Sequence, residues 1–225
     1  MSEMKARLRR RLGTELFVIV LLTIVFFILF PRRPMVLDEC LALFAVVLLI
    51  LNAGFTKSMV WNRFPPSLSG RERLRRCLVA VVGWTSVFLL ILFIGALYIG
   101  YSQGGLKGIF IRISNWHIIF AVGLYFSWAL VQQTLFQFYL LGRLLILLPA
   151  PVAIVLTGVA FSMVHLPNVG VTVATAVAGI VWSGLYYRYR FLSPLAFSHA
   201  LLGSALFSWV YGEDVVQGLI GVLFS

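Results

Sequence analysis

The sequence predicts an all-α integral membrane protein, a polytopic bundle of about seven (six to eight) transmembrane helices. Apolar residues make up 61% of the 225 residues and charged residues 11%. A soluble globular domain has about 45–50% apolar and about 25% charged residues. Mean hydropathy is +1.02. Apolar runs of roughly 20 residues recur along the chain, the length that a helix needs to cross a hydrocarbon layer about 30 Å thick.

The expected spans follow one another with short connections. They cover residues 14–30, 37–55, 77–100, 116–137, 151–166, 169–187 and 191–211. A last stretch, 215–224, is short for a span, and whether it forms one is left open. The first run is not predicted to be a cleavable signal peptide, because "FPRRP" after it offers no small-residue cleavage site. The main connections are 56–76, with Pro-Pro and Ser-Gly turn signals, and the glycine-rich segment 100–108, expected as a loop.

Basic residues set the expected orientation, because cytoplasmic loops carry an excess of Lys and Arg. With the N-terminus in the cytoplasm, 14 of the 18 Lys and Arg fall on the inner side. The other four are Arg32, Arg33, Lys107 and Arg112. Short loops and a strongly basic inner face suit a bacterial inner (plasma) membrane.

The basic clusters also indicate partners. We expect "KARLRRRL" and "RERLRR" to contact the anionic headgroups of membrane lipids. Nucleic-acid binding is excluded as a poor interpretation of the net charge of +11. The positive charges lie at membrane edges and form no basic surface with interleaved aromatic side chains.

Polar residues inside the apolar runs are the main clue to function, since ionisable groups within a membrane are rare and often functional. No carboxylate occurs between Glu72 and Glu213, and all three histidines lie in that stretch. His117 stands at a predicted span boundary beside a tryptophan, where an interfacial anchor is the favoured interpretation. His165 and His199 lie deeper, in "FSMVHLPN" and "FSHALLGSA".

Three glutamines share this apolar setting, in the segment "VQQTLFQFY". Lipid cannot satisfy amide and imidazole groups, so these side chains should face the interior of the bundle. We expect one cavity, nearer the cytoplasmic half, with the two histidines within about 12 Å of each other. The converging residues would be Gln132, Gln133, Gln137, His165 and His199.

Three motifs stand in order in the second half of the chain: "QQTLFQFYLLGRL", then "FSMVHLPN", then "LSPLAFSHALLGSAL". This arrangement resembles the CPBP family, which comprises the CAAX prenyl endopeptidases, their bacterial relatives and bacteriocin-processing proteins. The family pattern is Glu-Glu with an Arg four residues after the second Glu, then Phe-x-x-x-His, then His-x-x-x-Asn. Phe161 and His165 match the second motif, and His199 begins the third.

The resemblance covers roughly residues 115–210, the four helices of the family's core. It implies one integral membrane domain with two parts. Residues 1–112 would hold the N-terminal transmembrane helices with basic cytoplasmic segments. Residues 113–225 would hold a CPBP-like intramembrane peptidase core.

The chain departs from the family pattern at four positions. Gln132 and Gln133 replace the Glu-Glu pair, Gln137 replaces the Arg, and Gly203 replaces the Asn. The resemblance implies catalytic positions at Gln132, Gln133, His165 and His199. It implies substrate-binding positions at Gln137, Phe161, Asn168, Gly203 and Ser204.

These replacements change the chemistry that the site can perform. In the family, glutamates helped by a histidine activate water, while the Asn and a His stabilise the oxyanion. An amide cannot act as a base at any working pH, whereas a neutral imidazole is a competent base. All three charged positions are neutral together, so no unpaired charge remains in a low dielectric. Amides and imidazoles hydrogen-bond across helices at roughly 0.6–2 kcal/mol per contact, which makes a structural or peptide-binding network reasonable.

Other chemistries fit less well. A zinc site needs three or four His, Cys or carboxylate ligands, so two histidines without an acid predict no tightly bound metal, and we expect no cofactor. A serine protease would need a pair such as Ser183 and His199, but the glycine two residues before the serine is absent. A small-molecule transporter would use glycine-rich, kinked helices and internal amides, but the two halves show no inverted repeat.

The sequence thus predicts a CAAX-endopeptidase-like membrane protein that binds or processes a membrane-associated peptide or protein. Two alternatives stay open, a non-catalytic scaffold that binds a partner and a transporter. Whether the chain cleaves its ligand is left undecided at this point.

Overall fold

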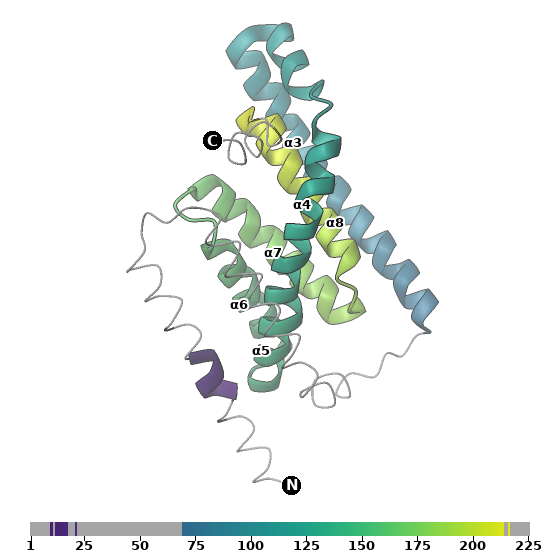
Figure 1. The fold of residues 1–225 in the computed structure, drawn as a ribbon, viewed down its shortest axis with the longest axis vertical. Helices are drawn as coiled ribbons and strands as arrows, with labels where there is room; N and C mark the ends of the chain where they lie inside the picture. Colours follow the sequence, from purple (N-terminus) through teal and green to yellow (C-terminus); the bar gives the residue numbers. More distant parts are fainter. Residues whose placement is uncertain (1–9, 11, 18–20, 22–68, 214–215, 217–225) are drawn as a thin grey trace. The chain divides into compact units, whose positions relative to one another are not determined.

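The computed structural model describes residues 10, 12–17, 21, 69–213 and 216 (Figure 1). Within this part of the chain every regular element is a helix, which confirms the predicted all-α class. In order these are α3 (Gly70–Ile113), α4 (Ile118–Gln133), the π-helix η1 (Thr134–Leu140), α5 (Leu141–Leu147), α6 (Ala150–Met163), α7 (Val169–Tyr189), α8 (Ser193–Ala205) and the π-helix η2 (Leu206–Tyr211). The predicted spans 14–30, 37–55 and 215–224 lie wholly or largely outside the described residues.

Three described segments are long and apolar enough to cross a membrane: Gly70–Ile113, Ile118–Leu147 and Val169–Tyr189. The predicted spans 77–100, 116–137, 151–166, 169–187 and 191–211 coincide with helices. The outer face of α3 is apolar, with Val79, Val82 and Tyr98 exposed over 68%, 62% and 77% of their surfaces. Apolar side chains pointing outward along a whole helix suit a lipid surrounding. The chain is a membrane protein, while the total number of spans stays a prediction.

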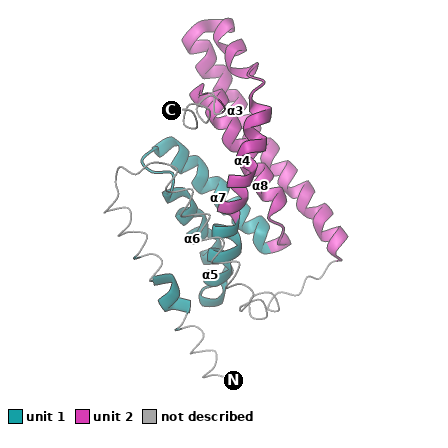
Figure 2. Cartoon of the chain, viewed as in Figure 1, with its two compact units in different colours: residues 1–67, 134–187 teal, residues 68–133, 188–225 magenta. Residues whose placement is uncertain are grey.

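The chain forms two compact units that interleave in sequence (Figure 2). Unit 1 holds residues 1–67 and 134–187, and unit 2 holds residues 68–133 and 188–225. The units are delimited by contacts between residues. The predicted boundary near residue 112 is of another kind, because it separates the N-terminal helices from the part of the chain that resembles the family. That boundary stays a prediction.

Small residues bring the helices of unit 2 together. Helix α8 packs against α4 and α3, and η2 packs against α3. Ala129 of α4 forms a fully buried cluster with Ala196 and Ala200 of α8. Small side chains at such positions let membrane helices approach closely. The hydroxyls of Thr85 in α3 and Ser198 in α8 add a buried hydrogen bond of 2.7 Å.

The segment 100–108, expected as a loop, is helical except for a local break. Only Gly104 and Gly105 leave the helical conformation, and Gly105 has a φ of +59°. A positive φ costs glycine little, so two residues suffice to interrupt the helix. The prediction of a nine-residue loop is therefore wrong, because the flanking residues keep their helical hydrogen bonds.

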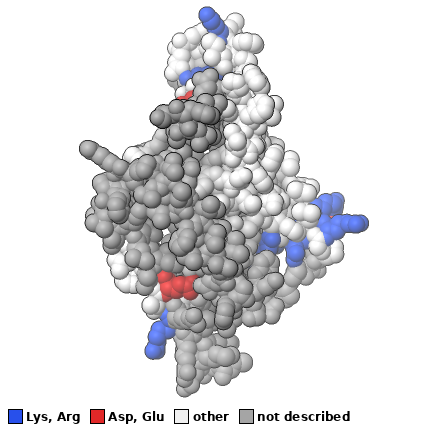
Figure 3. Space-filling model, in the orientation of Figure 1, with Lys and Arg blue, Asp and Glu red and all other residues white. Residues whose placement is uncertain are grey.

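Helix α3 begins with charged residues. The side chain of Ser69 accepts a hydrogen bond from the backbone N–H of Glu72, a capping arrangement. Glu72 also pairs with Arg75 and Arg76 at 2.9 and 2.7 Å. In Figure 3 the blue side chains gather at this end of α3, and white surface follows further along unit 2. The basic connection and the apolar span thus adjoin, as at a membrane edge.

In unit 1, α6 and α7 touch through glycines. A Cβ atom on Gly158 of α6 would lie 2.6 Å from the backbone nitrogen of Ile180 in α7. A Cβ atom on Gly179 would lie 3.0 Å from the ring of Phe161. Two helix backbones can lie this close only where no side chain intervenes. This contact positions Phe161 and the turn that follows it.

Candidate functional site

In unit 2, His199 lies on the buried face of α8 and is only 3% exposed. Its Nε2 lies 3.4 Å from the hydroxyl oxygen of Tyr125 in α4, a long hydrogen bond. The two rings meet edge to face, with centroids 5.5 Å apart and an angle of 79°. Tyr125 therefore sets the position of the imidazole that begins the third motif.

The same tyrosine explains the departure at Gly203. A Cβ atom at this position would lie 2.6 Å from Cε1 of Tyr125. Such a distance is too short for non-bonded carbon atoms, whose contacts are favourable at about 3.5–4.0 Å. The Tyr125 ring thus occupies the space that any side chain at position 203 would need, and its hydroxyl lies near His199.

The glutamines of unit 2 are buried at the end of α4. Gln132 is 9% exposed and Gln133 is fully buried. Within the described residues, Oε1 of Gln132 and both amide atoms of Gln133 have no hydrogen-bond partner, and neither does the hydroxyl of Ser204. An unsatisfied buried polar group costs about 1–3 kcal/mol. Groups of this kind are candidates for contact with a ligand or with water.

In unit 1, Gln137 lies in η1 and is fully buried. Its Nε2 donates a hydrogen bond of 3.4 Å to the hydroxyl of Ser183 in α7. Its Oε1 has no partner among the described residues. Ser183 was the candidate nucleophile of a serine protease. Its side chain is fully buried, and its hydroxyl accepts this hydrogen bond from Gln137. A π-helical turn often marks a functional site, and here it carries the position where the family has its arginine.

His165 lies in the turn after α6. Its Nδ1 is 3.0 Å from the carbonyl oxygen of Phe161, four residues earlier. The ring of Phe161 contacts three others, with centroid distances of 5.2 Å to Phe136, 5.2 Å to His165 and 5.7 Å to Trp182. The second motif thus forms an aromatic cluster with the imidazole at its edge.

Asn168 closes the same turn and immediately precedes α7. Its Oδ1 accepts a hydrogen bond of 3.1 Å from the backbone N–H of Val171, and its carbonyl accepts one from Thr172. This is the geometry of an N-cap, which satisfies amide groups at the first turn of a helix. The side chain is exposed. Its predicted contact with a substrate stays a prediction beside this structural role.

Unit 1 also contains a buried cation with its counter-ion. Arg143 in α5 is 5% exposed and lies 3.4 Å from the carboxylate of Glu15. The hydroxyl of Tyr139 donates a hydrogen bond to the same carboxylate. The guanidinium also stacks over the Tyr139 ring at 4.7 Å from its centroid. No Asp or Glu occurs between Glu72 and Glu213, so the counter-ion of Arg143 comes from Glu15 in the N-terminal segment.

The predicted site residues divide between the two units. Gln137, Phe161, His165 and Asn168 belong to unit 1, and Gln132, Gln133, His199, Gly203 and Ser204 belong to unit 2. The relative positions of the units are not determined, so convergence on one cavity stays a prediction. Among the described residues no group of three or more His, Cys, Asp and Glu could hold a metal ion. The expectation of a metal-free site stays a prediction as well.

Both units combine apolar helices with buried or half-buried amide and imidazole side chains, and this combination defines a membrane protein with polar groups among its apolar helices. Residues 114–205 match the family model described as type II CAAX prenyl endopeptidase Rce1-like. Residues 114–205 are thus similar to the Rce1-like CAAX protease family, and the predicted CPBP resemblance is confirmed over this stretch. No curated protein and no solved structure matches the chain.

Tyr125 is the residue that sequence reasoning missed. It belongs to none of the three motifs and lies 74 positions before His199 in the chain. A pattern based on sequence spacing could not connect the two. The one signal was indirect: a glycine where the family has an asparagine indicates that another group fills the space.

Proposed function

We propose that this chain binds a segment of a membrane-associated protein at its polar site and does not cleave it by glutamate chemistry. The observation that supports this proposal most is the burial of neutral amides at positions predicted to match the family's catalytic and substrate-binding residues. Gln132, Gln133 and Gln137 all keep amide atoms without partners among the described residues. The backbone of a bound peptide offers N–H and C=O groups that complement such amides.

Hydrolysis would lack its usual base. General-base assistance contributes about 10²–10⁴-fold to such reactions, and amides cannot provide it. Tyr125 supports binding of a carbonyl group, because its phenol hydroxyl is a hydrogen-bond donor beside the position of the missing asparagine. The site therefore keeps donors for a peptide carbonyl while it has lost the carboxylates that activate water.

The first test compares activity between variants. Purified wild-type protein in liposomes is incubated with a pool of membrane peptides from its host, and products are measured by mass spectrometry. We expect no cleavage. The double variant Gln132→Glu, Gln133→Glu should also remain inefficient, because Gln137 and Gly203 still depart from the family pattern. Restored carboxylates would be desolvated without an arginine, which favours their protonated form. Efficient cleavage by wild type would contradict the proposal.

The second test concerns binding. Gln133→Leu keeps the approximate volume of the side chain but removes its amide. It should abolish co-purification of a specific membrane partner without unfolding the protein. Thr157→Val is the matched control, because Thr157 is fully buried and its hydroxyl bonds, among the described residues, to the Ala153 carbonyl of its own helix alone. If both variants retain the partner equally, the amide has no role in binding.

A second candidate is a peptidase with a histidine base, which the contact between Tyr125 and His199 favours. Wild type would then cleave a membrane peptide, and His165→Ala and His199→Ala would each abolish cleavage while the protein stays folded in detergent. If both variants keep the activity of wild type, this chemistry is excluded.

The distribution of Lys and Arg supports a proposal for location and orientation. We propose a bacterial inner membrane, a cytoplasmic N-terminus and contacts between the basic clusters and lipid headgroups.

A further inference from the structure

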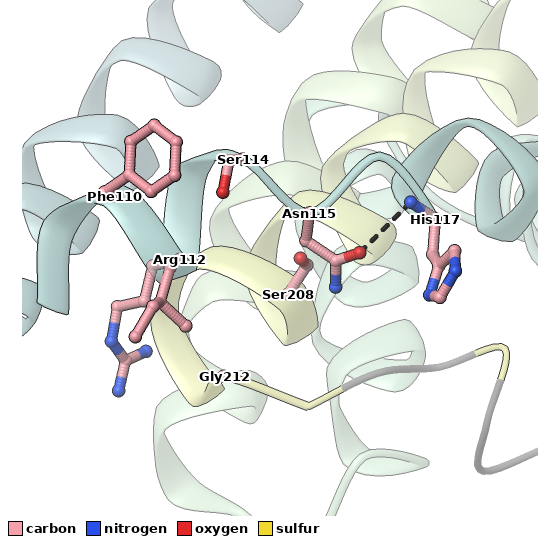
Figure 4. Close-up of a pocket in the computed structure, with 8 residues that line it drawn as sticks. Phe110, Arg112, Ser114, Asn115, His117, Ser208 and Gly212 are labelled. Carbon is pink, nitrogen blue, oxygen red and sulfur yellow. Dashed lines mark hydrogen bonds between the residues drawn. The ribbon is translucent and has the colours of Figure 1, made fainter. Parts of the chain in front are cut away.

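A pocket of about 380 Å³ lies in unit 2, where the end of α3, the start of α4 and the end of η2 come together (Figure 4). Its polar lining comprises Arg112, Ser114, Asn115, His117 and Ser208. None of its lining residues is acidic. The pocket is separate from the three motifs, and nothing in the proposed function uses it.

The hydroxyl of Ser208 is the first indication of a ligand. Ser208 is 6% exposed, and its Oγ has no hydrogen-bond partner within the described part of the chain. Asn115 lines the same pocket, and in Figure 4 its side chain is drawn next to that of Ser208. A buried hydroxyl without a partner costs free energy unless a ligand or water completes it.

Positive charge is the second indication. The guanidinium of Arg112 donates hydrogen bonds of 3.0 and 2.8 Å to the carbonyls of Trp209 and Val210. These bonds hold it at the pocket, next to Gly212, whose φ of +72° favours glycine and where a Cβ would lie 3.2 Å from the guanidinium. The bonds leave the full positive charge in place. An anion with several acceptor oxygens complements this charge and the hydroxyl and amide groups around it.

The surroundings indicate where the anion comes from. The pocket lies at the connection between two segments long enough to cross a membrane, Gly70–Ile113 and Ile118–Leu147. Phe110 and Ile111 line it and are 72% and 61% exposed, and Trp116 and Ile119 nearby are 63% and 73% exposed. Tryptophan at such a position is typical of the membrane interface. Apolar residues beside a basic pocket suit acyl chains attached to the anion.

We propose that this pocket binds the phosphate headgroup of an anionic phospholipid. The phosphate oxygens accept hydrogen bonds from the Ser208 hydroxyl and the Asn115 amide, and they interact with the charge of Arg112. The acyl chains lie along the exposed apolar residues of α3 and α4. The site differs from the basic clusters near the N-terminus and in residues 56–76, which are expected on the opposite side of the membrane.

The test is a titration of delipidated full-length protein in neutral detergent, followed by native mass spectrometry. The probes are dioleoylphosphatidylglycerol, dioleoylphosphatidylcholine and inorganic phosphate. Wild type should bind phosphatidylglycerol at least tenfold more tightly than phosphatidylcholine, and inorganic phosphate only weakly. Ser208→Ala should lose about tenfold in affinity for phosphatidylglycerol, as expected for a hydrogen bond to a charged group.

Ser208→Ala also separates binding from folding. The substitution removes a hydroxyl that has no partner in the described structure, so the melting temperature without lipid should stay equal or rise. Ser204→Ala is the matched control, since it removes another buried hydroxyl without a partner, outside the pocket. It should leave lipid affinity unchanged.

Three results would overturn the proposal. They are equal affinity of wild type and Ser208→Ala for phosphatidylglycerol, equal affinity for the two lipids, and binding of inorganic phosphate as tight as that of the lipid. The last result would assign the pocket to a soluble anion. Arg112→Gln, checked for an unchanged thermal transition, should remove the preference for phosphatidylglycerol over phosphatidylcholine.

Discussion

The surroundings of His165 in unit 1 and His199 in unit 2 differ in how each imidazole is held. His165 is half-buried, and its Nδ1 contacts a carbonyl only four residues earlier. His199 is almost fully buried, and its Nε2 contacts a tyrosine 74 residues away on another helix. A local turn therefore positions the first histidine, while packing between helices positions the second.

This difference determines how each histidine should respond to mutation. Contacts within one turn persist as long as that turn forms, whereas contacts between helices depend on the separation and rotation of both partners. We expect substitutions at helix contacts to displace His199 readily. His165 should move only when α6 itself shifts against α7.

The largest effect should come from breaking the α6–α7 contact with Gly158→Leu. The new side chain would meet the backbone of Ile180, which cannot move aside as a flexible side chain can. We expect a loss of about 3 kcal/mol, at the upper end for an overpacked core. Thermal unfolding in detergent measures it. Gly184→Ala, with nothing within 4 Å of its added Cβ, is the control and should be neutral or stabilising. An unchanged melting temperature for Gly158→Leu would contradict the glycine contact.

Gly203→Asn, which restores the family residue, should have the next largest effect. The obstacle here is the ring of Tyr125, a side chain, so we expect a smaller loss of about 1–3 kcal/mol. The double variant Gly203→Asn, Tyr125→Ala should lose less stability than the two single losses added together, by at least about 0.5 kcal/mol. Strict additivity in thermal unfolding would show that the two residues do not compete for space.

Asn168→Ala should cost about 1 kcal/mol, the usual value for loss of an N-cap side chain. For a chain of this size that lowers the melting temperature by about 2–4 °C. Asn168→Asp keeps the capping oxygen and serves as the control. If Asn168→Ala lowers partner binding while its stability is unchanged, the substrate-binding prediction for this residue is supported over the capping role.

The smallest effect on stability should come from Tyr125→Phe. It removes one long hydrogen bond to His199 and keeps the ring, so we expect a loss of about 0.6 kcal/mol, the average for such bonds in membranes. The effect on partner binding should be larger, because the hydroxyl is the proposed donor to a peptide carbonyl. Quantified co-purification of the partner with wild type and Tyr125→Phe checks this. Equal binding by both proteins would leave Tyr125 with a packing role alone.

The sequence predicted the helical class and most described helices with good accuracy. Runs of apolar residues and glycine or proline boundaries act over short distances, so each predicted span from residue 116 to 211 lies within a few residues of helix ends, whereas α3 extends beyond the predicted span 77–100 at both ends. The motif order also sufficed for the family, which the match over 114–205 confirms. The prediction of a loop at 100–108 was wrong because glycine content alone does not show that only two residues, Gly104 and Gly105, leave the helical conformation.

By itself, the sequence determined that the chain is an apolar helical membrane protein, and it predicted that amides stand at the positions of the family's charged residues. Both properties are carried by residue types at given positions. Only the tertiary structure decided that the Tyr125 ring lies against Gly203, that Ser183 accepts a hydrogen bond from Gln137, and that a basic pocket forms around Ser208. Those contacts join residues tens of positions apart. They depend on how far each helix is rotated and how closely its backbone approaches its neighbour, which periodicity in one chain segment does not specify.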